Sequence, residues 1–530
     1  MRHCAMNKTT RYNLIIALTY SFTLIGGMFL GYKFLKDQGY SFTRTTHLAE
    51  NNSDKVEEII HIINRKYVDE INADTLNHLP IDSLLHKLDP HSAYLPPQEA
   101  NGLAETLGGN FTGVGVEYYI LKDTLLVTHV IKDGPAYMAG LKQGDKILKI
   151  DTLFVSGKSL PREQMTGKIK GPKGTSVTLT ILHAGSLQPL ALTMKRGRVK
   201  VSTIDASYLL NPEIGYIRIS KFGADTDKDF VEALKDLKSQ GMKKLVLDLR
   251  DNGGGYLTSA TGLANQILEE NKLIVYTEGK HDPRTDYLAT GGGEFQDGKL
   301  AVLINENSAS ASEILAGAVQ DLNRGIIIGR RSFGKGLVQE QFPFGDGSAL
   351  NLTIARYYTP SGRSIQKSYK NGYTAYQNEI GDRYADGELT HKRRLLKDTV
   401  KKRVFEKGGI QPDIYVKIDT VGFNKLYVNL GVKKVLPDFV YDVLANRYTP
   451  SFIEQNMNIF NVNDTDFKDL IKYIQGRNIP IDMRQMMEAK PLIMNDLKVL
   501  LCKYHLGAAG YYKALNLSDA AVKQAITSLQ

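Results

Sequence analysis

Tryptophan is absent from this chain, and only two of its 530 residues are cysteine, Cys4 and Cys502. Two cysteines are too few for a disulfide framework or for a metal cluster held by several thiolates. A single bridge between them is not expected either, because Cys4 precedes an apolar segment that is typical of a membrane helix.

The chain also lacks a strong excess of charge of one sign. Lys and Arg total 67 against 57 Asp and Glu, which gives a net charge of +10 and leaves a nucleic-acid role possible but not demanded. Hydrophobic residues make up 42% and charged residues 23%, so wholesale disorder is excluded. A chain of this length is expected to contain several domains.

One long uncharged run stands near the N-terminus, at residues 14–32. As a helix it would span about 28 Å, close to the hydrocarbon core of a bilayer. Arg2, Lys8 and Arg11 precede it, which favours an N-terminus in the cytoplasm and the rest of the chain outside. We therefore predict one membrane anchor within residues 1–35. A cleaved signal peptide is the alternative, although no clear cleavage site follows the run.

The remainder of the chain changes character several times. Residues 53–104 have apolar side chains at helical spacing, and residues 105–200 contain short β-type runs separated by glycine-rich turns. Residues 201–370 alternate buried strands with helices, which indicates an α/β core. Residues 371–405 are polar and predict a surface excursion, whereas residues 420–530 are mostly helical in pattern.

Serines crowd the start of one predicted helix, in NENSASASEILAGAVQD at 305–321. A serine at such a strand-to-helix junction can expose its Oγ beside the unpaired N–H groups of the helix N-terminus. That arrangement suits a nucleophile that develops an oxyanion nearby. Serine is also a common helix cap, so this stretch alone does not establish catalysis.

A lysine flanked by glycines follows, Lys335 in GRRSFGKGLVQEQ at 329–341. The glycines allow close approach to another element, and burial would lower the pKa of the amine so that it could take a serine proton. Gln339 lies four residues on and could orient the amine. No histidine occurs from 282 to 390, so Lys335 is the simplest local base, although a histidine from elsewhere is not excluded.

Three glycines follow an apolar strand in LVLDLRDNGGGYL, residues 245–257. Their backbone N–H groups could form an oxyanion hole or an anion nest, or simply a flexible turn. A phosphate loop is disfavoured because G-x-x-x-x-G-K-[ST] is missing. G-x-S-x-G is also missing, which disfavours a serine hydrolase of small esters.

Together these stretches resemble the C-terminal processing peptidases, a serine-protease family also called tail-specific proteases. The likeness runs from about residue 55 to about 416. Its landmarks are LDPHSAYL (88–95), FTGVGVEY (111–118), GPAYMAGLKQGDKILKID (134–151), GYIRISKF (215–222), LDLRDNGGG (247–255), SASASEILAGAVQD (308–321), GKGLVQ (334–339), YYTPSGRSIQ (357–366) and GIQPDI (409–414).

The resemblance implies a serine peptidase with a Ser-Lys dyad and no metal or organic cofactor. The family nucleophile is the middle serine of SASAS, here Ser310, and the base 25 residues later falls on Lys335. The assisting glutamine falls on Gln339. The oxyanion donors would be the backbone N–H groups of Ala311 and of one glycine in the 253–255 run, for which we take Gly254.

The resemblance also implies a PDZ domain that recognises the C-terminal tail of the substrate. Its carboxylate-binding loop would be Thr112, Gly113, Val114 and Gly115, followed by an edge strand from Val116. Exposed N–H groups there can bind a C-terminal carboxylate while the peptide adds a strand to the sheet.

The expected fold is a multidomain α/β protein with an α/β (crotonase-like ββα) protease core, an inserted PDZ domain, helical N- and C-terminal regions and one N-terminal membrane anchor. The predicted divisions are an anchor or signal sequence (1–35), a linker (36–52), a helical N-terminal region (53–107), the PDZ domain (108–200), the protease core (201–418) and a helical C-terminal region (419–530).

The expected activity is endopeptidase cleavage near protein C-termini, with substrates that have free apolar C-termini. The alternative is a membrane-tethered PDZ binding protein with an inactive protease core. We expect the catalytic part in the periplasm of a bacterial cell envelope, held by a single-pass anchor in the inner membrane or released after signal cleavage. A homo-oligomer is expected only from helical termini in relatives, and no nucleic-acid partner is expected.

Overall fold

The computed structural model describes residues 52–71, 80–157, 160–390 and 408–530. Contacts divide the chain into residues 1–59, of which only the start of helix α2 (Asn52–Lys66) is described, and residues 60–530. None of the described helices is both long and apolar enough to cross a bilayer. The predicted anchor at 1–35 and linker at 36–52 lie outside the described residues, except for the first residue of α2, so both stay predictions.

The protease-like core is built on a six-stranded sheet in the order β10-β11-β12-β15-β16-β19. Only β10 runs antiparallel to its neighbour. The strands are β10 (Ile204–Asn211), β11 (Ile214–Ile219), β12 (Lys244–Asp248), β15 (Lys299–Ile304), β16 (Ile326–Gly329) and β19 (Ile414–Tyr415). Every residue of β11 is buried, as expected for a strand covered on both faces.

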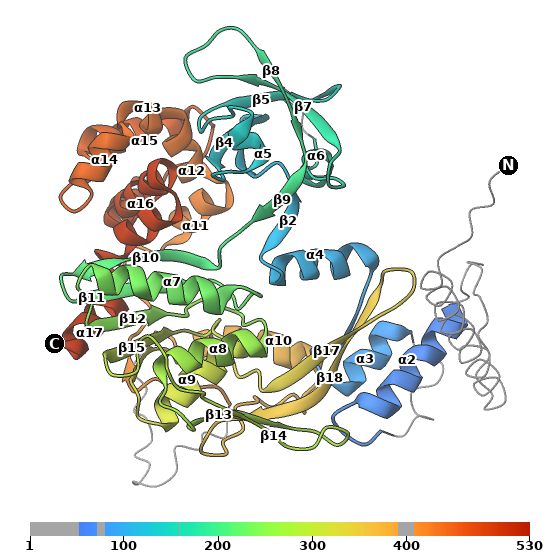
Figure 1. Cartoon of the computed structure of the whole chain (residues 1–530). Coiled ribbons are helices and arrows are strands. Elements are labelled where there is room, and N and C mark those ends of the chain that lie inside the picture. The colour runs from blue at the N-terminus through green and yellow to red at the C-terminus, as the bar shows by residue number, and fades with distance from the viewer. Residues whose placement is uncertain (1–51, 72–79, 158–159, 391–407) are drawn as a thin grey trace, which may run out of the picture. The chain divides into compact units, whose positions relative to one another are not determined.

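Helices cover both faces of this sheet (Figure 1). Leu245 and Leu247 of β12 pack into one cluster with helices α7 (Thr226–Ser239), α8 (Leu257–Ile267) and α9 (Ala311–Asp321). Val246, which lies between them, packs on the other side with helix α17 (Ala520–Leu529). Successive side chains of a strand point to opposite faces, so this alternation follows directly from the strand geometry.

A second sheet carries the loop that follows β16. Its order is β1-β18-β13-β14, and β17 also pairs with β18. The strands are β1 (Ala93–Leu95), β13 (Leu273–Glu278), β14 (Thr285–Leu288), β17 (Leu337–Pro343) and β18 (Ala349–Tyr358). Helix α3 (Ile81–Leu88) precedes β1. The mixed α/β fold predicted from the sequence is therefore confirmed.

A separate strand-rich module is inserted between helix α4 (Pro97–Leu107) and β10. The paired strands β2 (Asn110–Gly113) and β9 (Gly197–Lys200) lead into and out of it. Its sheet runs β3-β4-β5-β7-β8, with β6 (Leu153–Phe154) beside β5, and it has its own apolar core. The elements are β3 (Val116–Leu121), β4 (Thr124–Val130), α5 (Pro135–Met138), β5 (Lys146–Ile150), α6 (Arg162–Ile169), β7 (Ser176–Leu182) and β8 (Leu190–Lys195).

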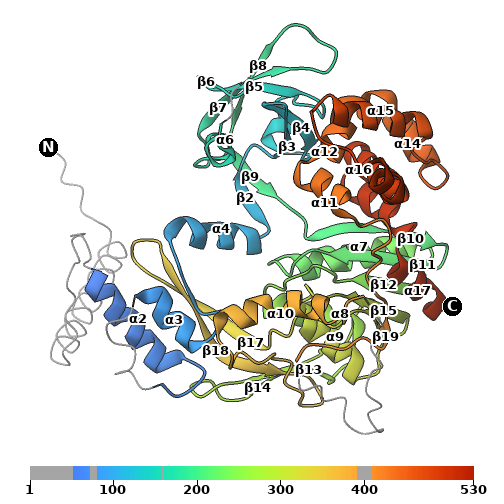
Figure 2. The same ribbon diagram turned by 180° about the vertical axis from the view of Figure 1, so that it is seen from behind.

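The C-terminal region is helical from Lys425 onward and has a core of its own. Its elements are α11 (Lys425–Val432), α12 (Val435–Phe439), the π-helix η2 (Val440–Leu444), α13 (Ala445–Arg447), α14 (Pro450–Asn456), α15 (Asp464–Gln475), α16 (Met483–Asn516) and α17. Figure 2 shows these helices beside the strand-rich module, while α17 returns to the core sheet.

The polar segment 371–405 is mostly exposed in its described part, as expected, but it also contributes buried side chains. Its described part forms helix α10 (Tyr373–Ala385), in which Tyr376 and Arg383 are buried. Arg383 donates to the backbone oxygens of Arg331 and Ser332, next to the loop that carries Lys335. Burial of a charged side chain is tolerated here because its hydrogen bonds are supplied by fixed acceptors, a pairing that a composition-based reading does not detect.

The docking of α17 on the core sheet leads to a prediction about stability. Asp519 caps α17 by accepting from the N–H groups of Ala521 and Val522, and its other oxygen binds Arg250 at 2.7 Å. Asp519→Ala should lower the free energy of unfolding by about 2 kcal/mol or more, since it removes both a cap and an ion-pair partner. Urea unfolding of the full chain, followed by circular dichroism, measures it.

Asp482→Ala is the matched control, because Asp482 caps α16 through the N–H groups of Arg484 and Gln485, and its other oxygen accepts from the Gln485 amide and from no arginine of the described residues. It should cost only the contribution of a cap. Equal losses for the two variants would show that the Arg250 contact contributes nothing.

Candidate active site

Ser310 occupies the turn between strand β15 and helix α9, as N-cap of the helix. Its backbone has φ 54° and ψ −115°, a conformation that a non-glycine residue adopts only at a cost of about 1–3 kcal/mol. The strain is tolerated because both flanks of the turn are fixed. Ser308 Oγ donates to Leu249 O at 2.8 Å, and Ser312 Oγ donates to Asn252 O at 2.9 Å. The outer serines thus tie the turn to the end of β12.

Lys335 lies in the loop between β16 and β17, and its Nζ donates to Gln339 Oε1 at 2.7 Å. Gln339 is held in turn, because its Nε2 donates to the backbone oxygen of His91 at 2.6 Å. Burial lowers the pKa of Lys335, while Asp89 and Glu313 act in the opposite direction. Among the described contacts, none joins Lys335 Nζ to Ser310 Oγ by a hydrogen bond.

The flanking glycines let the Lys335 loop lie against neighbouring backbone. A Cβ on Gly336 would stand 2.9 Å from Gln366 N, and Gly334 has φ +91° with Gly409 N at 3.2 Å from where its Cβ would be. Neither position accepts a side chain without displacing backbone atoms. The close approach that the sequence suggested is therefore present, and it is directed at the segments 365–367 and 408–409.

Glu313 links the Ser310 turn to the Lys335 loop, and it was missed in the sequence. Its Oε2 accepts from Ser310 N at 2.8 Å and from Lys335 N at 2.9 Å. Its Oε1 accepts from Ser332 Oγ at 2.5 Å and from Gly334 N at 2.7 Å. The side chain is fully buried, and burial raises the pKa of Glu313 to about 7 against the opposing effect of these donors.

A signal for Glu313 was present in the sequence. Ser310 and Glu313 form the S-x-x-E spacing of a helix capping box, in which the acid reaches back to the N–H of the cap residue. This contact lies within the first turn of one helix, so the sequence alone could have predicted it. The three further donors, Ser332 Oγ, Gly334 N and Lys335 N, come from residues 19 to 22 positions farther along the chain, so only the fold brings them to the same carboxylate.

The expected oxyanion donors lie next to each other. A Cβ on Gly254 would stand 2.8 Å from Ser310 Cβ and 3.0 Å from Ala311 N, so only glycine fits against this turn. The N–H of Gly254 itself donates to Asn252 Oδ1 at 2.9 Å. Among the backbone bonds of the described residues, none uses the N–H of Ala311. Ala311 thus has a free donor, whereas Gly254 would have to release Asn252 first.

The side chains of Tyr357 and His91 lie near Ser310 and Lys335. Tyr357, at the end of β18, donates through its hydroxyl to the backbone oxygens of Ser310 and Lys335. The His91 ring lies edge-on to Phe333, and its Nε2 bonds with Tyr376 Oη at 2.7 Å. Burial, with Lys335 and Lys367 nearby, lowers the pKa of His91 to about 3, so its ring is neutral at pH 7. His91 and Tyr357 fall in two of the segments that carry the family resemblance, but the contacts of their side chains were not predicted.

The residues expected to bind a peptide carboxylate lie at the start of the strand-rich module. Thr112 and Gly113 belong to β2, Val114 is fully buried, and Gly115 has φ +79°. Strand β3 begins at Val116 and ends the sheet order, so its outer edge has no strand partner among the described strands. Their role in binding stays a prediction.

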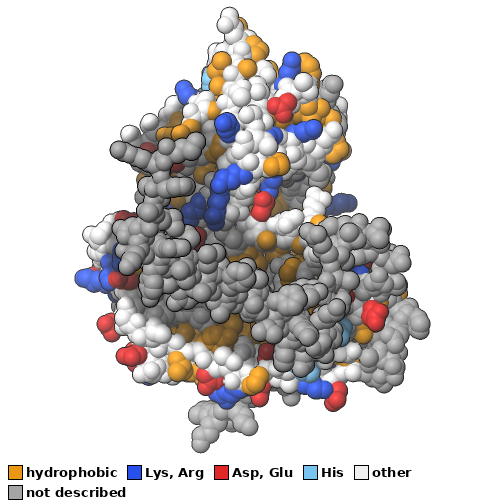
Figure 3. Space-filling view, turned by 45° about the vertical axis from the view of Figure 1, so that its right-hand side comes forward, with side chains coloured by type: hydrophobic (Ala, Val, Ile, Leu, Met, Phe, Trp, Pro, Cys, Tyr) orange, Lys and Arg blue, Asp and Glu red, His pale blue; other side chains and the backbone are white. Residues whose placement is uncertain are grey.

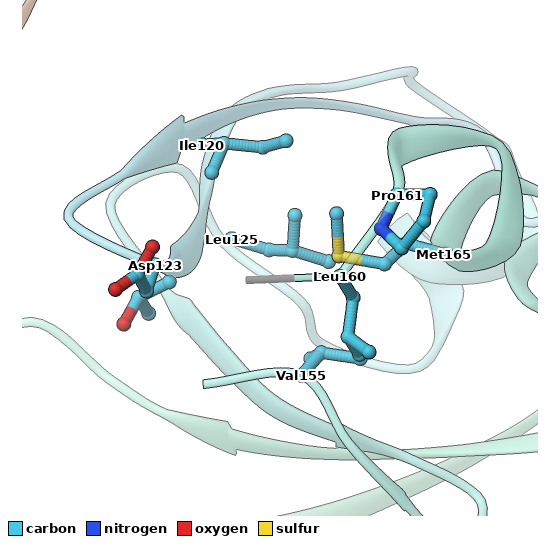
Figure 4. Close-up of a pocket in the computed structure, with 8 residues that line it drawn as sticks. Ile120, Asp123, Leu125, Val155, Leu160, Pro161 and Met165 are labelled. Carbon is cyan, nitrogen blue, oxygen red and sulfur yellow. The ribbon is translucent and has the colours of Figure 1, made fainter. Parts of the chain in front are cut away.

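Beyond them the groove between β3 and α6 is apolar. A cavity of about 400 Å³ is lined by Ile120 of β3, Leu125, Val155, Leu160, Pro161 and Met165, with Asp123 and Thr124 at one side. Figure 4 shows the apolar side chains converging on this space from the strand and from the helix. Such a cavity suits an aliphatic side chain.

Acidic and basic side chains are interspersed on the face that Figure 3 presents. Within the described residues, no group of three or more His, Cys, Asp or Glu side chains is arranged to hold a metal ion.

Comparison with known proteins agrees with this arrangement. The model of peptidase family S41 matches residues 213–373, and that of the PDZ domain matches residues 104–182. The first match contains Ser310, Glu313, Lys335 and Gln339, and the second contains β3 and α6.

Relatives align over most of the described chain. A "Carboxy-terminal-processing protease" of Bartonella bacilliformis is 36% identical over 357 residues, which covers 66% of this chain and 81% of the relative. A "Probable CtpA-like serine protease" of Staphylococcus aureus is 34% identical over 318 residues, 59% of this chain and 62% of the relative. The photosystem II D1 C-terminal processing protease, a solved structure, is 27% identical with a TM-score of 0.37, covering 70% and 94% of the two chains.

The Bartonella relative is similar enough, and over enough of its length, to decide the family, and the S41 match falls on the segment that holds the serine and the lysine. This chain therefore belongs to peptidase family S41 and is a serine-type peptidase with a PDZ domain.

Proposed function

We propose that this peptidase cleaves protein substrates near their C-termini, with Ser310 as nucleophile, Lys335 as general base and the PDZ domain as the receptor for the substrate tail. One observation carries the proposal: the backbone N–H groups of Ser310 and Lys335 donate to the same oxygen of buried Glu313. The backbones of Ser310 and Lys335, which are 25 positions apart in the sequence, are thereby joined by hydrogen bonds to one oxygen atom. The printed name of the Bartonella relative supports the choice of C-termini as the site of cleavage.

The chemistry follows from the charge state of the lysine. Burial favours a neutral Lys335 amine, which accepts the proton of Ser310 Oγ as that oxygen attacks the scissile carbonyl. The free N–H of Ala311 lies at the helix N-terminus, where the negative oxygen develops. The tetrahedral adduct then collapses, the leaving amine takes the proton from Lys335, and water hydrolyses the acyl-enzyme to restore Ser310.

The missing contact between Lys335 and Ser310 fits a substrate-free state. Catalytic hydrogen bonds are often long or misaligned before substrate binds and tighten in the reacting complex. In this state Lys335 Nζ is held by Gln339, and Gln339 by the His91 backbone oxygen. In the proposed reaction, Lys335 Nζ exchanges the Gln339 contact for one with Ser310 Oγ.

The proposal includes the cellular location. Residues 14–32, preceded by basic residues, would anchor the chain in the inner membrane with the peptidase in the periplasm, or be removed as a signal peptide. Fractionation of cells, followed by N-terminal sequencing of the mature chain, separates these two outcomes.

The rival function is a tethered PDZ binding protein without activity. It differs in what happens to a bound tail, which would be held but never cut. The strained Ser310 turn disfavours it, because a binding protein has no use for a costly backbone conformation at this position.

The first prediction concerns the dyad. Ser310→Ala and Lys335→Ala should each reduce cleavage of an unstructured substrate with an apolar C-terminus by at least about 10³-fold, since nucleophile and base act as a unit. Cleavage is measured by mass spectrometry of the products. If Lys335→Ala kept most of its activity, another base would be at work. If the wild type bound tails without cutting or reacting with a serine-directed probe, the binding-protein alternative would hold.

The second prediction concerns pH. Lys335 must lose its proton to act, so kcat/KM should rise with pH, with a midpoint below the 10.5 of a free lysine. Gln339→Glu places a carboxylate where Nζ now meets an amide oxygen, which stabilises the charged amine and should move the midpoint up by about one pH unit or more. Gln341→Glu, on the exposed face of the same strand, should leave the profile in place. An unmoved midpoint in Gln339→Glu would mean that the profile reports another group.

The third prediction concerns Glu313. Glu313→Gln keeps the shape but replaces one acceptor oxygen by an NH₂ group that faces N–H or O–H donors, so Ser310 and Lys335 would no longer be drawn together. We expect kcat to fall about 10²-fold while KM changes little. Glu340→Gln, exposed on β17, is the control. A proportionate loss of folded protein with normal kcat per folded molecule would assign Glu313 a purely structural role.

A further inference from the structure

A cleft separates the edge strand of the PDZ domain from the long helix α16 of the C-terminal region. It has a volume of about 850 Å³. Four consecutive residues of β3, Val116 to Tyr119, line it, together with Thr166 of α6. The opposite wall carries Tyr504, Ala508 and Tyr511 of α16, with Lys503 at the rim.

The strand side of the cleft is formed by β3, whose outer edge has no strand partner among the described strands, and by Thr128 and His129 of the adjacent strand β4. Consecutive side chains of a strand point to opposite faces, so a cavity that touches four residues of β3 in a row follows that strand and is not confined to one face. An extended peptide that pairs with this edge would lie in the cleft. Its side chains would alternate, one set toward the groove under α6 and the other set away from it.

On the side of β3 that faces the groove, the space beside Tyr118 is already occupied. Tyr118 Oη bonds with Thr166 Oγ1 at 2.5 Å, so this side chain reaches from the strand to the helix. The apolar cavity at Ile120 lies farther along the strand. Near the carboxylate loop, therefore, the side chains that point away from the groove have the larger space to explore.

The wall of α16 is fixed in front of that space by its own contact and by contacts of the helices packed against it. Gln143 donates to the backbone oxygen of Tyr504 in α16, whereas Tyr119 Oη donates to Asp438 of α12 at 2.7 Å and Lys122 pairs with Asp442 of η2. Helices α12 and η2 share an apolar core with α16. Beyond Gly507, whose φ of 67° interrupts the helix, Tyr512 O accepts from Tyr208 of the core. The wall thus belongs to the same unit as the PDZ domain and the core.

We propose that α16 is the second half of the substrate-tail site, and that it selects the penultimate residue of the tail and the residue two positions before it. The inference rests on the proposed function. The rings of Tyr504 and Tyr511, with Tyr441 beside them, favour aromatic or large apolar side chains at these two positions. The last residue would be read by the PDZ groove, and its neighbour by the C-terminal region.

The test uses two adjacent exposed alanines on α16. Ala508 lines the cleft and Ala509 does not. In the Ser310→Ala background, Ala508→Trp should weaken binding of a fluorescent, unstructured peptide at least tenfold, while Ala509→Trp leaves it unchanged. The peptide is about ten residues long, with a free carboxylate, an apolar last residue and Phe at the two selected positions. Binding is read by fluorescence anisotropy, and circular dichroism verifies that both variants fold.

A second peptide keeps the inference falsifiable if Ala508→Trp does not fold. Replacing its two Phe residues by Ser should weaken binding to the Ser310→Ala protein at least tenfold, whereas Ser at the intervening position should not. Equal binding of the Phe and Ser peptides, or unchanged binding to folded Ala508→Trp, would overturn the inference. Because these assays require no cleavage, an inactive wild type would refute the proposed protease function without affecting them.

Discussion

The active site depends on one buried carboxylate. Glu313 accepts four hydrogen bonds, from Ser310, Ser332, Gly334 and Lys335, and so joins the Ser310 turn to the Lys335 loop. A buried carboxylate with fewer donors would be expensive to desolvate, and four unpaired donors would be expensive to bury. The Glu313 carboxylate and its four donors can therefore be buried at low cost only together. The strained Ser310 backbone is stable in this setting because its N–H, its carbonyl oxygen and the two flanking serines are all engaged.

The same burial acts on both charged groups of the site. It raises the pKa of Glu313 to about 7 and lowers that of Lys335. The folded state thus binds the Glu313 proton more tightly than the unfolded chain does, so the stability that this proton contributes is lost as pH rises from about 4.5 to 7. The full set of acceptors exists only once that proton has gone, and Lys335 is a base only once its own proton has gone. At higher pH Glu313 is ionised and accepts all four hydrogen bonds, and Lys335 is neutral and can act as a base. The folded state then lacks the stability that the Glu313 proton contributes at low pH.

The sequence predicted the strands and the helices of the core because these depend on local patterns, and apolar runs mark β12 and β15. Ser310 and Lys335 were assigned as a dyad through the family resemblance, and that assignment stays a prediction. Contacts between distant segments were not readable. Nothing local shows that His91 O would hold Gln339, that Tyr357 would reach the backbone of Ser310 and Lys335, or that a polar segment would bury Arg383. For Gly254 the general position followed from the sequence, but the use of its N–H by Asn252 depends on the conformation of the loop.

The C-terminal helices carry no recognisable sequence motif, yet they contact both the core sheet and the PDZ domain. Asp519 reaches Arg250, whose guanidinium also binds buried Asp248 at the end of β12. The glycine run that meets Ser310 follows that strand directly. At the other end of the region, Asp438 and Tyr504 contact the PDZ domain. One polypeptide segment thus touches both the strand that leads to the oxyanion loop and the edge strand expected to receive the substrate. Helix α16 lines the cleft beside β3 and continues through Tyr512 and Asn516 onto β10 of the core sheet.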